Sequence, residues 1–193
     1  MLAFALTMIA AYTAGSVNFS IFLFRFLGRE DPRTRFSGNP GVSNVYRQAG
    51  PGWAALVLCM DLVRAMAVAL LALWACTPGQ VPWCALALIA GNRFPLFHGF
   101  RGGKGVANTL GFTVVAAPWA ALLGAGAWLL VFGITRRPFL GSFGMVAVLA
   151  AGLARQAAYS AWAVAAVLLL LGSIVHAHRA NIAGLRSGRK GTE

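Results

Sequence analysis

Long apolar stretches separated by short polar loops constrain this chain more than any other feature. Only 10% of its 193 residues are charged, and its mean hydropathy is +0.74. A soluble domain carries about 25% charged residues, whereas about 20 mostly apolar residues make a helix that crosses a bilayer. We therefore expect an all-α integral membrane protein, folded as a single domain over residues 1–193. The expected helical segments are 2–26 (a retained first span), 53–75, 82–98, 106–117, 118–135, 138–154 and 158–176.

The positions of the 16 basic residues predict how these segments are oriented. With seven segments, every Lys and Arg except Arg64 and Arg155 falls on one side; Arg64 lies within a span and Arg155 lies opposite. Basic loops remain cytoplasmic, so we expect a seven-segment transmembrane bundle with the N-terminus outside and the C-terminus cytoplasmic. The basic segments that share the cytoplasmic side are 27–52, 99–105, 135–137 and the tail from His176 to Lys190.

The scarcity of acidic residues and the spacing of the cysteines exclude several functions. The four acidic residues are Glu30, Asp31, Asp61 and Glu193. They are too few and too scattered for a two-carboxylate hydrolase or a carboxylate metal site. The cysteines, Cys59, Cys76 and Cys84, lack metal-ligand spacing, and we interpret them as apolar residues or free thiols. We expect no metal, no cofactor and no nucleic-acid partner, since the basic residues are scattered over separate loops.

The loop Phe100–Ala107 is the strongest local signal for binding chemistry. Gly102, Gly103 and Gly105 surround Lys104. Glycines allow backbone N–H groups to approach an anion closely, and lysine adds a compact positive charge. It is not a Walker A loop, because Gly105 follows Lys104 where Ser or Thr is required. The pattern predicts a phosphate cradle, and the alternative is a flexible basic loop between two helices.

A second candidate anion site lies in the polar loop after the first span. Ser37 to Gly41 is rich in turn residues and includes Asn39. Ser43, Asn44 and Arg47 follow at spacings that share one face of a short helix, which Pro40 is suited to begin. Free N–H groups at a helix N-terminus, together with an arginine, bind anions. The alternative is an ordinary cytosolic loop with a surface helix.

Two polar features fall inside predicted spans. Gly15–Asn18 interrupts the first span, where small residues serve helix packing and polar residues face protein or water. Asp61 and Arg64 are three residues apart in the second span. They form either a functional ionisable pair or a structural ion pair.

The predicted topology brings the two anion sites to one face of the membrane. The turn containing Ser142 and the tail segment His178–Asn181 lie on the same side. These segments supply hydroxyl, amide, imidazole and cationic groups with hardly any carboxylates. The sequence therefore predicts a site at the membrane surface that binds a phosphorylated substrate.

Five motifs in order resemble the bacterial acyl-phosphate:glycerol-3-phosphate acyltransferases, over nearly the whole chain. They are Gly15–Asn18, Asp31–Arg33, Ser37–Arg47, Phe100–Ala107 and His178–Ile182. The resemblance implies a seven-helix protein of the bacterial inner membrane with its active site on the cytoplasmic side. It implies transfer of an acyl group from acyl phosphate to the 1-hydroxyl of glycerol 3-phosphate, giving lysophosphatidic acid for phospholipid synthesis. It further implies contact with membrane lipids and possible association with the enzyme that forms acyl phosphate, and it implies no metal.

The resemblance also implies roles for individual residues. Arg47 and Lys104 bind phosphate, while His178 and Asn181 position the glycerol. His178 is the best candidate to assist proton removal; the alternative is a surface histidine just past a helix end. The acyl chain enters between helices from the membrane. Ser37 is a further catalytic candidate, and the remaining substrate-binding candidates are Asn39, Asn44, Gly102, Gly103, Gly105 and Ser142.

Several positions depart from the pattern of these acyltransferases. Arg64 stands where lysine is usual, Ala65 where glycine is usual, and Asn92 where histidine is usual. Phe139 replaces an expected serine, and Gly184 an expected arginine. These departures keep two alternatives open. One is a diverged, non-catalytic relative that binds lipid phosphates or acts as a membrane partner, and the other is a small transporter that uses the two ionisable residues of the second span.

Overall fold

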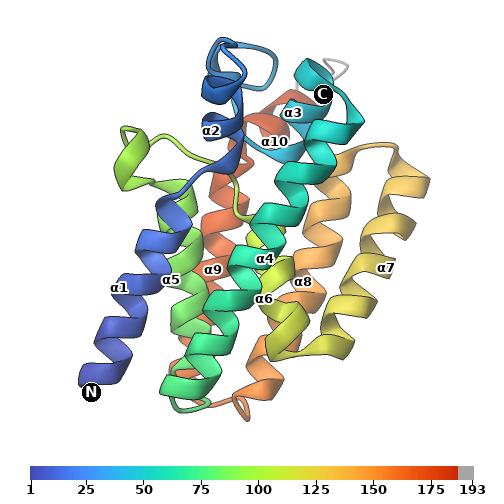
Figure 1. Ribbon diagram of the computed structural model, residues 1–193. Helices are drawn as coiled ribbons and strands as arrows, with labels where there is room; N and C mark the ends of the chain where they lie inside the picture. Colours follow the sequence, from blue (N-terminus) through green and yellow to red (C-terminus); the bar gives the residue numbers. More distant parts are fainter. Residues whose placement is uncertain (187–193) are drawn as a thin grey trace.

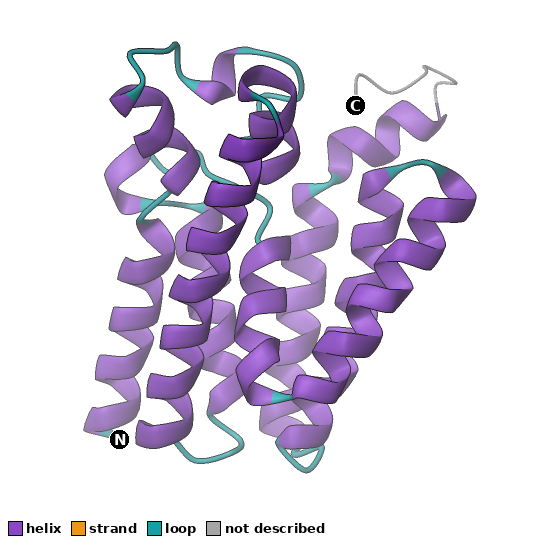
Figure 2. Ribbon diagram, turned by 45° about the vertical axis from the view of Figure 1, so that its right-hand side comes forward, coloured by secondary structure: helices purple, strands orange, loops and turns teal. Residues whose placement is uncertain are grey.

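The computed structural model describes residues 1–186, and all regular structure in that range is helical, with no strand (Figure 2). This confirms the all-α prediction. Two short 3-10 turns, η1 (Pro32–Thr34) and η2 (Leu96–His98), lie in the loops. The helices are α1 (Leu2–Ser16), α2 (Phe19–Phe26), α3 (Val42–Ala49), α4 (Pro51–Ala75), α5 (Val81–Arg93), α6 (Val106–Ala116), α7 (Pro118–Thr135), α8 (Pro138–Gln156), α9 (Ala161–Ala177) and α10 (Arg179–Arg186).

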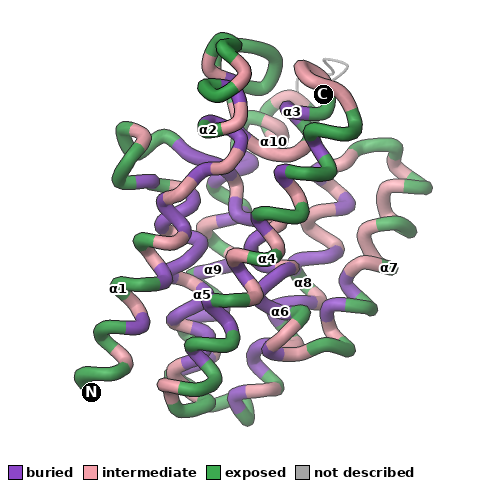
Figure 3. Tube along the Cα trace, in the orientation of Figure 1, coloured by how far each residue is buried: buried purple, intermediate pink, exposed green. Residues whose placement is uncertain are grey.

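The outer surface of the bundle is apolar, as a membrane protein requires. On α7, Leu122, Leu130 and Ile134 are each more than 60% exposed, and Figure 3 shows exposed residues along the length of this helix. Apolar residues all around a helix indicate a lipid-facing environment. Within residues 1–186, four stretches are long and apolar enough to cross a membrane, and a fifth is added if α9 and α10, bent by 56°, form one span. The four stretches are Leu2–Phe26, Pro51–Ala75, Pro118–Thr135 and Pro138–Gln156.

The first apolar segment is two helices rather than the one expected over 2–26. The break falls at Val17 and Asn18, and the Asn18 side chain accepts a hydrogen bond from the Ile21 N–H at 3.2 Å, which caps α2. The first N–H groups of a helix have no partner within the helix, and an asparagine at the N-cap satisfies one of them. The polar patch therefore redirects the chain, and it leaves the Val17 carbonyl outside a regular helix.

Gly15 serves close packing between α1 and α5. A Cβ atom on Gly15 would lie 2.1 Å from the Leu88 carbonyl oxygen, and one on Gly91 would lie 2.0 Å from the Tyr12 carbonyl oxygen. Neither helix has room for a side chain at these points, so the backbones touch. This bears out the helix-packing interpretation of the glycine in this patch.

The third predicted segment, 82–98, ends as a helix at Arg93. Pro95 explains the stop, because proline disfavours helical geometry in the residue before it and cannot donate a backbone hydrogen bond. By contrast, the separate helices expected over 106–117 and 118–135 are present as α6 and α7. Residues 179–186 form α10, a helix that the polar tail did not reveal; Arg189 and Lys190 of that tail lie outside the described residues.

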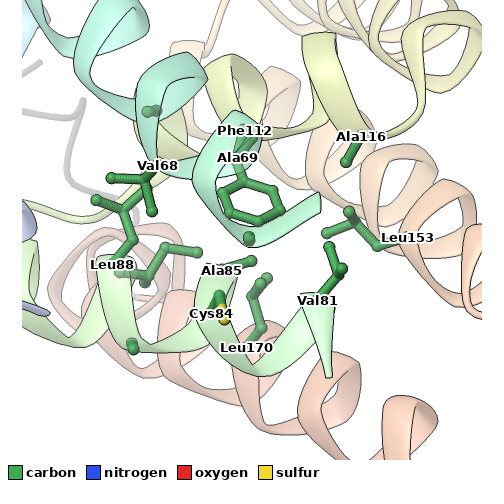
Figure 4. Packing of buried hydrophobic residues seen from close by; sticks show 14 of the residues in the cluster. Val68, Ala69, Val81, Cys84, Ala85, Leu88, Phe112, Ala116, Leu153 and Leu170 are labelled. Carbon is green, nitrogen blue, oxygen red and sulfur yellow. The ribbon is translucent and has the colours of Figure 1, made fainter. Parts of the chain in front are cut away.

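The core lies where α4, α5, α6, α8 and α9 meet. Figure 4 shows the Phe112 ring of α6 among Ala69 of α4, Leu88 of α5 and Leu170 of α9. These residues are fully or almost fully buried. Helices α2, α3 and α10 gather at the end of the bundle opposite the N-terminus (Figure 1). The core therefore supports a platform of loops and short helices at one end, and this end carries the candidate site.

Candidate active site

One cavity of about 450 Å³ opens at this end of the bundle and gathers the residues that the sequence singled out. It reaches from the loop before α3, past the start of α6, to α8 and α10. Of the predicted site residues, only Gly102 is absent from its lining. The predicted residues that line it are Ser37, Asn39, Asn44, Arg47, Gly103, Lys104, Gly105, Ser142, His178 and Asn181.

Gly102 and Gly103 hold the glycine loop against α5 and do not offer their N–H groups to an anion. The Gly102 N–H donates to the Arg93 carbonyl at 3.1 Å, and the Gly103 N–H donates to the Asn92 carbonyl at 2.9 Å. A Cβ atom on Gly102 would lie 2.0 Å from the Asn92 carbonyl oxygen. The prediction that these two N–H groups form the phosphate cradle is therefore wrong. Both residues are glycine because the loop touches the end of α5.

The part of this loop that presents backbone N–H groups to the cavity is the start of α6. Gly105 is the N-cap, has a φ of 84° and makes no side-chain cap, and the first intrahelical bond runs from the Thr109 N–H to the Gly105 carbonyl. The N–H groups of Val106 and Ala107 come before that bond, and both residues line the cavity. Lys104 stands beside them. A helix N-terminus next to a lysine is suited to an anion, and these N–H groups lie one turn later along the chain than the glycines that the sequence singled out.

A second helix N-terminus opens into the same cavity. Helix α3 begins at Val42 with Gly41 as its N-cap, so the expected start at Pro40 is two residues early. Ser43 and Arg47 line the cavity with this helix start. Arg47 lies in the last turn of this short helix, so the cavity is shared by the start of α3 and by a cation one turn further along it.

Asn44 braces the loop that precedes α3. It is 1% exposed, and its Nδ2 donates to the Pro32 carbonyl at 2.7 Å and to the Arg35 carbonyl at 3.3 Å. Both donor positions of this amide are used by the protein. Asn44 lines the cavity, and its amide group holds the preceding loop in place. The spacing of Ser43, Asn44 and Arg47 along the helix did not reveal this role.

Asp31 and Arg33 join the loop before α3 to the segment that leads into the glycine loop. Arg33 Nη1 donates to the carbonyls of His98 at 2.7 Å and Arg101 at 2.8 Å, and Arg33 Nη2 lies 2.6 Å from Asp31 Oδ2. The hydrogen bond from Arg33 holds the pKa of the Asp31 carboxyl below its ordinary value. We name this group the Asp31–Arg33 clasp. It lies outside the cavity lining and sets where the glycine loop begins.

His178 is held in one tautomer at the cavity wall. It follows the last residue of α9, is 2% exposed, and its Nδ1 lies 2.8 Å from the Ile174 carbonyl. A carbonyl only accepts, so Nδ1 carries the proton and Nε2 is the unprotonated acceptor. Burial, together with the nearby Lys104 charge, lowers the pKa of His178 to about 4. The imidazole is therefore neutral at pH 7, and the Asn181 amide oxygen beside it accepts a hydrogen bond from Lys104 Nζ.

The far part of the cavity is apolar. Leu110 of α6, Trp128 and Leu129 of α7 and Met145 of α8 line it, and Leu129 is 65% exposed at the outer surface. Ser142 also lines the cavity, and its hydroxyl donates to the Pro138 carbonyl at 3.1 Å. The cavity thus joins a cationic end to an apolar chamber that reaches the lipid-facing side of the bundle. In residues 1–186, no three His, Cys, Asp or Glu side chains gather as metal ligands.

The family model for glycerol-3-phosphate acyltransferase matches residues 5–188. The chain belongs to the glycerol-3-phosphate acyltransferase family. It is 38% identical over 186 residues to the glycerol-3-phosphate acyltransferase of Pseudomonas aeruginosa, covering 96% of this chain and 97% of that protein. It is 41% identical over 187 residues to that of Azotobacter vinelandii, covering 96% and 97%.

Solved structures of the same family match the fold. The crystal structure of PlsY (YgiH), an integral membrane glycerol 3-phosphate acyltransferase, in its glycerol 3-phosphate form superposes with a TM-score of 0.88 at 30% identity, covering 96% of this chain and 93% of that one. The lysophosphatidic acid form gives 0.85 at 29% identity, with the same coverage. The protein is therefore a membrane-embedded member of this acyltransferase family.

Three of the departures from the acyltransferase pattern lie at close contacts in this chain. The side chain of Asn92 lies against Gly103, where an added Cβ would be 2.8 Å from Asn92 Nδ2. Ala65 is fully buried against Gly111, where an added Cβ would lie 2.9 Å from the alanine Cβ. Phe139 packs edge-on against Phe143, with ring centroids 5.9 Å apart.

The ion pair in the second span is buried beside the cavity. Arg64 Nη2 lies 2.7 Å from Asp61 Oδ1, and the side chains are 8% and 13% exposed, respectively. Asp61 and Asn108 line the cavity, although the sequence did not place either in the site. The only available signal for Asn108 was a polar residue within the first turn of an apolar segment. Asp61 and Arg64 therefore form a buried ion pair, and Asp61 also lies at the cavity wall. Both the structural and the functional interpretation of the pair stay open.

Proposed function

We propose that the cavity transfers an acyl group from acyl phosphate to glycerol 3-phosphate. The 1-hydroxyl oxygen of glycerol 3-phosphate attacks the acyl carbonyl carbon and forms the new ester bond. The bond from that carbon to the phosphate oxygen then breaks, and the electron pair leaves with inorganic phosphate. The hydroxyl proton passes to a base or to the departing phosphate, and the lipid product is lysophosphatidic acid.

The observation that carries this proposal is that two helix N-termini and two cations line one cavity. The start of α6 with Lys104 and the start of α3 with Arg47 provide two places for phosphate groups. The reaction needs two, one for each substrate. Because a mixed anhydride already has a good leaving group, alignment of the two substrates supplies much of the catalysis.

His178 is placed to receive the hydroxyl proton through Nε2. In the substrate-free protein, burial keeps its pKa near 4, which makes the imidazole a weak base. Two bound phosphates bring negative charge close to the ring and raise its pKa toward the range of an efficient base. In this proposal the base becomes effective when both substrates are present, with Asn181 and Ser37 as polar contacts to the glycerol end.

The acyl chain occupies the apolar chamber of the cavity. Trp128 stacks on Phe132 with ring centroids 4.8 Å apart, which fixes one wall, and Leu110 and Met145 form others. The chain reaches this chamber from the bilayer past Leu129. The membrane itself therefore delivers the lipid substrate, and the water-soluble acceptor arrives from the other end.

We further propose seven membrane crossings, with the N-terminus outside and the site on the cytoplasmic side of a bacterial inner membrane. Helices α5 and α6 have 13 and 11 residues, fewer than the roughly 20 of a full crossing. Their shortness is consistent with a glycine loop that dips into the bundle to begin α6 at mid-height (Figure 1). The basic loops at this end support the orientation. Association with the enzyme that forms acyl phosphate remains a prediction.

Purified protein in detergent tests the proposal directly. With acyl phosphate and glycerol 3-phosphate, the protein should release inorganic phosphate and form lysophosphatidic acid, and omission of either substrate should stop product formation. Expression in a bacterium that lacks its own acyltransferase addresses the non-catalytic alternative, because restored growth excludes it. Absence of turnover, alongside an active relative as control, would reject the acyltransferase function.

A further inference from the structure

Arg64 connects three parts of the chain that meet behind the cavity. Its Nη1 donates to the Val17 carbonyl at the break between α1 and α2. Its Nη2 donates to Asp61 Oδ1 at 2.7 Å and to Asn108 Oδ1 at 2.6 Å. The guanidinium also lies over the Phe19 ring, 5.0 Å from its centroid. A planar guanidinium with several donors can make all of these bonds at once, whereas the single ammonium group of lysine cannot.

These bonds determine how the Asn108 amide is oriented. A guanidinium has donors and no acceptor, so the Asn108 atom that faces Arg64 must be Oδ1. Nδ2 then points away from Arg64, and no residue within 1–186 accepts a hydrogen bond from it. Asn108 nevertheless lines the cavity. An amide donor without a protein partner at a cavity wall is ready for a ligand acceptor.

The position of Asn108 along α6 suggests which acceptor it meets. Val106 and Ala107, at the helix start, face the place proposed for phosphate, and Leu110 lines the apolar chamber. Asn108 lies between them. In an acyl phosphate, the carbonyl group lies between the phosphate and the chain. The donor is therefore level with the carbonyl oxygen, which gains negative charge when the hydroxyl attacks.

We propose that Asn108 is a catalytic residue whose Nδ2 donates a hydrogen bond to the acyl carbonyl oxygen, and that Arg64 is the positioning residue that fixes this amide. The inference rests on the proposed acyl transfer. During attack, the carbonyl π electrons move onto the oxygen, and Nδ2 stabilises that oxyanion until the phosphate departs. Asp61 balances the Arg64 charge, so the buried support is neutral as a pair.

Kinetic constants of Asn108→Leu test the donor, because leucine has a similar volume and cannot donate. Loss of one oxyanion donor costs about 100-fold in kcat. We expect that loss with the KM for glycerol 3-phosphate changed less than about threefold, since ground-state binding does not use the developing charge. Thr113→Val, on the same helix and fully buried, is the control and should keep the wild-type kcat. A kcat for Asn108→Leu within about threefold of wild type overturns the inference.

A second variant keeps the test decisive if Asn108→Leu does not fold. Asn108→Asp retains an oxygen for Arg64 and removes the donor, so it should show a comparable loss of kcat. Wild-type kcat in this variant overturns the inference. If the wild-type protein itself releases no phosphate, the proposed function fails. Activity in the wild type together with unimpaired Asn108 variants rejects the inference alone.

A double-mutant cycle tests whether Arg64 acts through Asn108. Lysine at position 64 keeps the charge and cannot make all three bonds, so Arg64→Lys should lower kcat about tenfold in the wild-type background. In the Asn108→Leu background it should lower kcat no further, because the amide is already gone. Equal losses in both backgrounds would show a general structural role and overturn the positioning role.

Discussion

Replacement of Gly102 by alanine should inactivate the protein, although Gly102 does not line the cavity. The new Cβ would lie 2.0 Å from the Asn92 carbonyl oxygen and 2.6 Å from Pro95 Cδ, whereas real Cβ atoms stay at least 3.0 Å away. The loop must therefore move by about 1 Å, the scale of overpacking in a tight core. That movement breaks the bonds from the N–H groups of Gly102 and Gly103 to the end of α5.

The magnitude follows from these contacts. Overpacking costs about 1–3 kcal/mol, and each lost backbone bond costs about 1 kcal/mol. The total for overpacking and two lost bonds is about 3–5 kcal/mol, which corresponds to a fall of roughly 10 °C in the unfolding midpoint of a chain this size. Displacement of a substrate-positioning group by about 1 Å lowers turnover by roughly 100-fold. Lys104 and the start of α6 follow directly on this loop, so both effects are expected.

Phosphate release and thermal unfolding of the same preparation measure the two effects. Gly52→Ala is the matched control, because its Cβ would meet nothing within 4 Å and Gly52 lies in the first turn of α4. It should leave turnover unchanged and should not lower the midpoint, since alanine is favoured over glycine in a helix. Wild-type turnover and midpoint in Gly102→Ala would refute the assignment of this glycine as an anchor.

Three further predictions concern the site. Lys104→Ala and Arg47→Ala should each abolish phosphate release, by about 1,000-fold or more in kcat/KM, because each removes a cation from a phosphate place; turnover near wild type would remove that residue from the site. Arg33→Met should lower kcat about tenfold by freeing the glycine loop from the Asp31–Arg33 clasp, and kcat equal to wild type would show that the clasp does not position it. For His178, folding favours the neutral imidazole because burial lowers its pKa from 6.5 to about 4. This contribution is complete above pH 6.5 and declines as the pH falls toward 4, so the unfolding midpoint of the wild type should fall more steeply over that range than that of His178→Gln; parallel curves would contradict it.

The sequence predicted the helical segments and the convergence of the loops because both depend on local patterns. Apolar runs of membrane length indicate helices whatever their neighbours are, and the distribution of basic residues predicts which loops share a side. Lys104 and Arg47 stood out through local motifs, and the role of His178 came from the resemblance to the acyltransferases. The structure brings all three residues to one cavity.

The details that the sequence did not reveal depend on partners distant along the chain. The N–H groups of Gly102 and Gly103 are used by α5, which no local pattern indicates. Asn108 became a candidate only through Arg64, 44 residues earlier in the chain. The break at Asn18 likewise depends on a cap within a segment whose hydropathy is that of a single span. Hydrogen-bond partners, unlike apolar periodicity, are determined by tertiary structure.

Product analysis of purified protein given acyl phosphate and glycerol 3-phosphate tests the central claim most directly. We expect one inorganic phosphate released for each lysophosphatidic acid formed, with both products lost in Lys104→Ala. Lysophosphatidic acid formation that does not depend on acyl phosphate, or no formation in a folded wild-type preparation, would contradict the account.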